Sequence, residues 1–268
     1  MITGIARSTL QKVSAPTFTV RRGWAYNLSM QNRILRSPAD LNDDDIRALY
    51  AGFDAPVNDL DCGQMCAPQN PSGKPFCCDI CHAVPAAYLS EWNALEPVTD
   101  LWHVWRGDEC AGNVKPETQR VNIELETPAG MMLLACLGPH ACERENRLLS
   151  CRQFPFFPYV TSDFRFLGLA YDWEFESACW VVSNLGGVSE AYRAEFVRTY
   201  DQVFALFQEE FDSYAARSEE MRAHFASIQR RIPLLHREGG FRLVSPVNER
   251  VYRVEESQLP QFGPYRVK

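Results

Sequence analysis

Half of the cysteines in this chain are concentrated in one short stretch of sequence. Five of the ten lie between residues 62 and 81, and two of these five are adjacent. A second, looser group follows between residues 136 and 151. Thiols at such short spacings form either a disulfide framework or a set of metal ligands. The first group consists of Cys62, Cys66, Cys77, Cys78 and Cys81, and the second of Cys136, Cys142 and Cys151.

Chain length and composition favour the metal interpretation. A chain of 268 residues that is 46% hydrophobic can bury a core without disulfides. No apolar run has signal-peptide length near the N-terminus or reaches the roughly 20 residues that span a bilayer. We therefore expect a cytoplasmic protein that does not enter membranes, whose thiols stay reduced. The net charge of −7 argues against a nucleic-acid partner.

The spacing within the two groups suggests how the ligands could converge. A tight turn brings both sulfurs of Cys78-x2-Cys81 to one side, and one helical turn does the same for Cys62-x3-Cys66. Adjacent side chains tend to diverge, so we expect Cys77 and Cys78 to serve different metals or different positions of a larger cluster. All eight cysteines of the two groups are therefore candidate ligands.

The sequence also predicts roles for the residues that surround the two cysteine groups. Cys179 is a candidate additional ligand, whereas Cys110 is expected not to bind. Asp79 is expected to cap the turn between Cys78 and Cys81. His82 and His140 are expected to have structural roles, and the alternative is that they bind the metal or donate a hydrogen bond to a cluster sulfur. The aromatic block at 154–158 forms either a dry shell beside Cys151 and Arg152 or simply part of the core.

The order of these residues resembles a known family. The first group with its adjacent pair, followed by Cys136, Cys142, Arg147 and then Cys151-Arg152-x-Phe154-Pro155, is similar to the YkgJ-type cysteine-cluster family. The resemblance covers about residues 58–185 and implies a metal-binding core that chelates zinc or iron. It departs from the family pattern in the long Cys66-x10-Cys77 gap and in having Leu148, not proline, after Arg147.

The resemblance leaves the reaction open. We expect an iron–sulfur cluster more than zinc, because adjacent cysteines and mixed spacings suit simple zinc tetrahedra poorly. The flagellin lysine N-methylases are similar in their cysteine region, which implies an alternative enzyme that uses S-adenosylmethionine on a protein substrate. A third alternative is an interaction module that zinc only staples together. The partner protein is not indicated by any of the three.

The pattern of apolar residues predicts one α+β domain with three portions. Residues 1–55 are a lead-in segment, 56–187 the cysteine-cluster core, and 188–268 a helical portion with a short strand-like tail, packed on the core. Helices are predicted over 44–53 and over 85–95. From 190 onward, after a Ser189 N-cap, the pattern predicts either one long helix or two helices with a break near 212–213. Strands are predicted at 17–21, 121–137 (as a hairpin), 165–173, 241–244 and 251–254.

Overall fold

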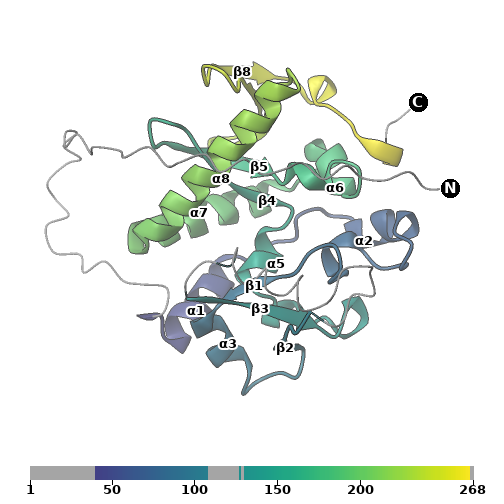
Figure 1. The fold of residues 1–268 in the computed structure, drawn as a ribbon, viewed down its shortest axis with the longest axis vertical. Coiled ribbons are helices and arrows are strands. Elements are labelled where there is room, and N and C mark those ends of the chain that lie inside the picture. Colours follow the sequence, from purple (N-terminus) through teal and green to yellow (C-terminus); the bar gives the residue numbers. More distant parts are fainter. Residues whose placement is uncertain (1–39, 108–126, 128–129, 266–268) are drawn as a thin grey trace, which may run out of the picture. The chain divides into compact units, whose positions relative to one another are not determined.

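A computed structural model of the protein describes residues 40–107, 127 and 130–265. These residues lie within a compact unit that spans Leu35–Lys268. The unit combines helices with two antiparallel sheets, which confirms the α+β class (Figure 1). In this described part of the chain, no helix is long and apolar enough to cross a membrane.

The larger sheet has five strands in the order β4-β5-β6-β7-β8, each antiparallel to its neighbours. Residue 187 is the predicted boundary between the cysteine-cluster core and the C-terminal portion, and the sheet contains strands from both. The predicted strands at 241–244 and 251–254 therefore form part of this sheet and not a separate tail. Gly168 of β5 pairs with His236 of β6, and a Cβ there would lie 2.2 Å from the Leu235 carbonyl oxygen. Only glycine fits this close approach. The strands are Phe156–Val160, Phe166–Tyr171, Ile232–His236, Phe241–Val244 and Val251–Val254.

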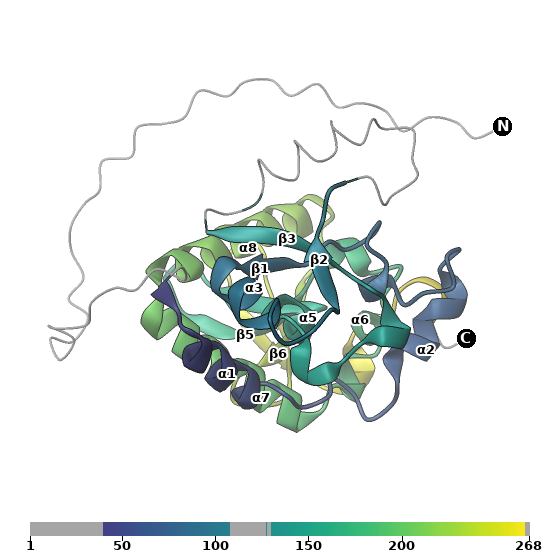
Figure 2. The same ribbon diagram turned by 90° about the horizontal axis from the view of Figure 1, so that it is seen from below.

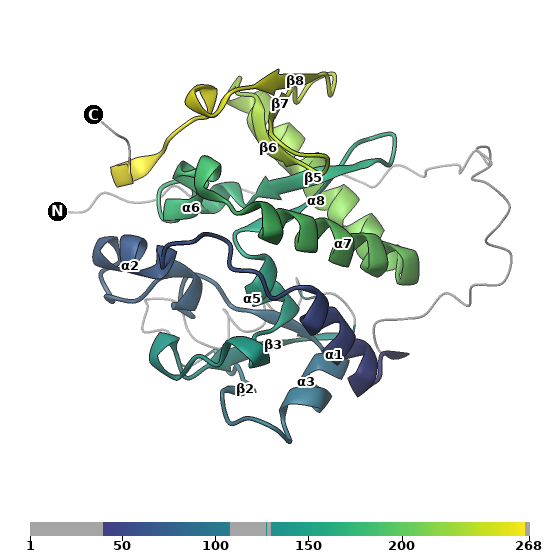
Figure 3. The same ribbon diagram turned by 180° about the vertical axis from the view of Figure 1, so that it is seen from behind.

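Two long helices, α7 (Glu190–Leu206) and α8 (Gln208–Ser227), cover this sheet (Figure 3). Every residue of β4 and β5 is buried, as expected for strands covered on both faces. In β5, Phe166 packs on Phe204 of α7, whereas Tyr171 packs on Phe225 of α8.

The start of the C-terminal helices is as predicted, but the break is not. The Ser189 hydroxyl accepts from the Tyr192 amide, which confirms it as the N-cap. The break falls at Phe207, whose backbone is extended and whose side chain is 1% exposed, and Ser213 lies inside α8. Packing of Phe207 in the core against Tyr88 interrupts the helix there, which the helical repeat cannot show.

A smaller sheet of order β1-β3-β2 stands beside α1 (Asp43–Gly52) and α3 (Leu89–Leu95) (Figure 2). The helix predicted over 44–53 is confirmed as α1, which opens on an Asn42–Asp45 capping box. The helix predicted over 85–95 is wrong in its first part, because residues 86–88 form β1 and pair with β3. That partner lies some 45 residues away, beyond any local pattern. The strands are Ala86–Tyr88, Trp102–Val104 and Met131–Cys136.

Two predicted elements cannot be compared with the structure. The strand at 17–21 and the first arm of the hairpin at 121–125 lie outside the described residues. The second arm of that hairpin is β3. The predicted strand at 165–173 is confirmed as β5.

Candidate metal centre

The first two cysteines of the cluster lie on a one-turn helix, α2 (Cys62–Cys66). Asp61 caps the helix by accepting from the Gly63 amide at 3.1 Å. Residues four apart share a helix face, so Cys62 and Cys66 face the same way. Cys66 is buried, and its Sγ lies 3.6 Å from the Gly63 carbonyl oxygen. The Cys62-x3-Cys66 spacing therefore lies on a helical turn, as predicted from the sequence.

Cys77 and Cys78 lie on a short 3-10 turn, η3 (Phe76–Cys78). Their Sγ atoms are 3.8 Å apart. The turn is followed by Asp79, whose carboxylate accepts from the Asn70 amide at 3.0 Å, the Ser72 hydroxyl at 2.7 Å and the Cys81 amide at 3.1 Å. Although burial alone would raise it, these hydrogen bonds lower the pKa of Asp79 to about 2. Asp79 therefore fixes the loop, as the sequence predicted.

We expect Asp79→Asn to lower the free energy of unfolding by roughly 1–3 kcal/mol. An asparagine side chain offers one acceptor oxygen, and its amide would face donors that the carboxylate now satisfies. Urea unfolding monitored by circular dichroism measures the loss. Asp163→Asn is the matched control, because Asp163 is exposed and pairs only with its near neighbours Thr161 and Arg165. Equal losses in the two variants would contradict the role given to Asp79.

The second group of cysteines comes from the end of one strand and the segment after it. Cys136 is the last residue of β3, Cys142 follows the 3-10 turn η4 (Pro139–Ala141), and Cys151 lies on α5 (Leu149–Gln153). The buried carboxylate of Glu91 anchors α5 by accepting from the Leu149 amide at 2.8 Å. The same carboxylate accepts from the Tyr50 hydroxyl and the Tyr88 amide. Glu91 thereby ties Cys151 to α1 and β1.

The arginine that faces the thiols is Arg147. Its Nε donates to the Cys142 Sγ at 3.1 Å. Burial opposes the positive charge, yet the neighbouring Cys142 sulfur raises the pKa of Arg147 above its ordinary value. Arg152, which directly follows Cys151, points instead to backbone carbonyls and to Asp54. Charge compensation beside the thiols therefore comes from Arg147, a residue that only the family resemblance singled out.

Eight cysteines in the described part of the chain are free thiols, and the charges of several of them act on one another. Burial raises the pKa of Cys62 to about 11, and the charge of Cys66 adds to this effect. Burial likewise raises the pKa of Cys179 to about 12, with contributions from Cys62 and Cys66. Burial also raises the pKa of Cys151, with contributions from other thiols of the second group. The eight are Cys62, Cys66, Cys77, Cys78, Cys136, Cys142, Cys151 and Cys179.

The adjacent pair connects the thiols of both groups. A hydrogen bond between the two sulfurs raises the pKa of Cys77 and lowers that of Cys78, because one proton is favoured between them. The charge of Cys78 also raises the pKa values of Cys136 and Cys151. Seven of the eight predicted ligands, together with Cys179, are thus free thiols, and the charge of Cys78 links members of both groups.

Cys81 differs from the other predicted ligands. It is disulfide-bonded in the structure, and a disulfide sulfur is not a thiolate ligand. Its role as a ligand requires reduction of that bond and stays a prediction. Cys179 joins the free thiols although its spacing gave no specific signal. Cys110 lies outside the described residues.

The two histidines near the cysteines occupy different surroundings. His82 lies 3.2 Å from the Asp79 carboxylate and packs edge-on against Phe76, in agreement with a structural role. His140 is exposed on η4. Neither contributes an imidazole to a set of converging ligands in the described residues.

The chemical type of these side chains suits a thiophilic metal, but their positions in the structure do not yet form a coordination site. Eight free thiols, together with an arginine that donates a hydrogen bond to one of them, match the chemistry of zinc and iron–sulfur sites. Among the described residues, however, no three Cys, His, Asp or Glu side chains stand close enough together to hold a metal ion. Coordination would therefore require the sulfurs to approach one another further.

The aromatic block after Cys151 is core. Phe156 and Phe157 are 2% and 5% exposed and belong to the main hydrophobic cluster, within β4. Phe154 packs edge-on against Phe175 with ring centres 4.9 Å apart. Of the two alternatives left open by the sequence, the structure supports the core.

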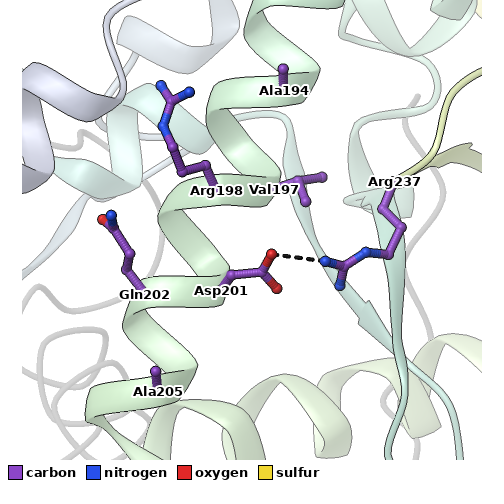
Figure 4. A pocket seen from close by; sticks show the side chains of 7 residues that line it. All are labelled: Ala194, Val197, Arg198, Asp201, Gln202, Ala205 and Arg237. Atoms are coloured by element: carbon purple, nitrogen blue, oxygen red, sulfur yellow. Dashed lines mark hydrogen bonds and ion pairs between the residues drawn. The ribbon is translucent and has the colours of Figure 1, made fainter.

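A surface pocket of 480 Å³ lies along α7, away from any cysteine (Figure 4). An ion pair between Asp201 and Arg237 crosses it at 2.7 Å. Its other lining residues are short or polar side chains of α7: Ala194, Val197, Arg198, Gln202 and Ala205. The lining provides no aromatic or thiol group, so this pocket gives no support to a cofactor site next to the thiols.

Comparison of the chain with family models, with curated proteins and with solved structures returns no match. The fold and the thiol cluster therefore carry the functional argument.

Proposed function

We propose that this protein is a metal-binding cysteine-cluster protein whose thiols hold an iron–sulfur cluster or zinc. The observation that carries the proposal is that eight free thiols come from four separate parts of the chain and that several of them affect one another's pKa. Buried thiols near one another are costly to ionise, and a bound metal cation removes that cost by replacing their protons.

Two further features support a thiolate site over a set of inert core cysteines. Arg147 donates to the Cys142 sulfur from a partly buried position, which places a positive charge beside the thiols. Six of the eight free thiols are only partly buried, so metals and reagents can reach them. Inert structural cysteines are typically enclosed in apolar surroundings.

Analysis of the metal and sulfide content of the purified protein distinguishes an iron–sulfur cluster from zinc. We expect protein purified without oxygen to carry iron and sulfide, with the broad visible absorption of thiolate-bound iron. Colourless protein with stoichiometric zinc would indicate the zinc-stapled module instead. In that case, removal of zinc by a chelator should unfold the chain. Absence of both metals, before and after anaerobic reconstitution, would contradict the proposal.

A further inference from the structure

Two guanidinium groups from separate elements meet at the turn that joins β6 to β7. The turn contains Gly239 and Gly240, both with positive φ. A Cβ on Gly239 would lie 3.3 Å from the Arg193 Nη2, and a Cβ on Gly240 would lie 3.4 Å from the Arg242 Nη1. Arg193 belongs to α7 and Arg242 to β7, so both border the same pair of glycines from different sides of the sequence.

Arg242 also faces a third arginine. It lies directly opposite Arg253 of β8 in the antiparallel register. Side chains at such positions share a face of the sheet with their Cβ atoms about 5 Å apart, and like charges there are destabilising. In the described part of the chain, neither of these two guanidinium groups forms an ion pair with a carboxylate. A bound anion would remove this repulsion.

The carboxylates near the turn do not neutralise the cluster. Glu190 pairs with Arg193, but the Glu190 side chain is 77% exposed, and a pair with so exposed a partner is worth little. Asp201 is committed to Arg237, the first residue of the turn, at 2.7 Å. Arg242 is therefore left with a positive charge that the protein does not balance.

The imidazole of His236 lies within the field of these arginines. It is the last residue of β6, and its Nδ1 accepts from the Glu238 amide at 3.2 Å. Burial lowers the pKa of His236, and the charge of Arg242 lowers it further against the opposing effect of Glu238. Burial and the charge of Arg242 likewise lower the pKa of Arg193. These directions agree with a net positive charge at the turn.

The surface pocket along α7 reaches the same turn (Figure 4). Arg237 of the turn lines it and faces Asp201 of α7 across it. Three apolar side chains of α7 contribute to its wall: Ala194, Val197 and Ala205. Its volume of 480 Å³ lies within the range of pockets that take small organic molecules. The arginines and this apolar wall are thus presented by the same two segments.

We infer that the turn and the pocket together bind a small phosphate monoester, with the phosphate on Arg193 and Arg242 and the organic part against α7. Guanidinium groups bind phosphate oxygens through paired, charge-assisted hydrogen bonds. A phosphate monoester carries close to two negative charges at pH 7, so it can balance two arginines, whereas a carboxylate balances one. The site shares no residue with the thiols and is independent of the proposed metal binding.

Isothermal titration calorimetry of the full chain tests the site with two probes, inorganic phosphate and phenyl phosphate, at constant ionic strength. We expect both to bind, and phenyl phosphate to bind more tightly because its ring enters the pocket. Arg242→Met should weaken the binding of both by about tenfold or more. Arg250→Met is the matched control, because Arg250 is exposed at the opposite end of β7 and should change neither affinity.

Two further measurements distinguish a binding site from a structural arginine. Because Arg242 faces Arg253 without a carboxylate, Arg242→Met should leave the urea midpoint of the phosphate-free protein unchanged or raise it. Ala194→Phe places a ring in the pocket from an exposed position on α7. It should weaken the binding of phenyl phosphate and spare that of inorganic phosphate.

Several results would overturn the assignment of this site. One is a wild type that binds neither probe, and another is equal weakening in Arg242→Met and Arg250→Met, which would show a response to total charge alone. A lower urea midpoint in phosphate-free Arg242→Met would make the arginine structural. Unchanged affinity of Ala194→Phe for phenyl phosphate would remove the pocket from the site. None of these results bears on the metal content of the thiols.

Discussion

Replacing Arg152 with methionine is expected to lower the free energy of unfolding by about 3–5 kcal/mol. The side chain is 6% exposed, and its guanidinium stacks over the Tyr50 ring at 4.5 Å. It ties the end of α1 to the loop before α5 through donated hydrogen bonds. Its acceptors are the carbonyl oxygens of Tyr50, Phe53, Arg144, Glu145 and Arg147 and the Asp54 carboxylate.

Methionine keeps much of the side-chain length and removes all five donors. The carbonyls at the end of α1 then lose partners in a place where little water can replace them, and each unsatisfied group costs about 1–3 kcal/mol. Urea unfolding monitored by circular dichroism measures the change. Arg165→Met is the matched control, because Arg165 is 60% exposed and its pair with Asp163 is worth little. A loss below about 1 kcal/mol in Arg152→Met would contradict this role.

Replacing Cys77 and Cys78 together with serine is expected to abolish metal binding altogether. Serine matches cysteine in shape but does not supply the soft thiolate that zinc and iron–sulfur sites require. Both cysteines are proposed ligands, so the double variant removes two thiolates from the donor set. Metal analysis of anaerobically purified protein measures the loss.

Met65→Ser provides the control for this variant. Met65 lies on α2 between two of the proposed ligands, and its side chain is 44% exposed. A serine there should leave both the fold and the metal content unchanged. Full metal content in the Cys77/Cys78 double variant would show that the metal is held elsewhere. Loss in both variants would indicate damage to the loop rather than loss of ligands.

A large part of the fold can be read from local sequence. α1, the N-cap at Ser189, and β5, β7 and β8 begin and end close to the predicted positions, because each depends on a repeat or a capping residue in its own segment. The break at Phe207 and the strand β1 are different. One depends on the packing of a single aromatic side chain, and the other on pairing with a strand some 45 residues later.

The same division applies to the candidate metal centre. The sequence by itself determined which thiols are candidates, since short spacings are a local property, and seven of the eight are free thiols in the structure. Only the tertiary structure decided that Cys179 joins them, through the packing of α6 (Trp180–Ser183) on α2. The tertiary structure also decided that Arg147 faces the Cys142 sulfur, whereas Arg152 faces backbone carbonyl groups such as that of Phe53. Both depend on contacts between distant segments, because a side chain's partners are set by packing and not by its neighbours in sequence.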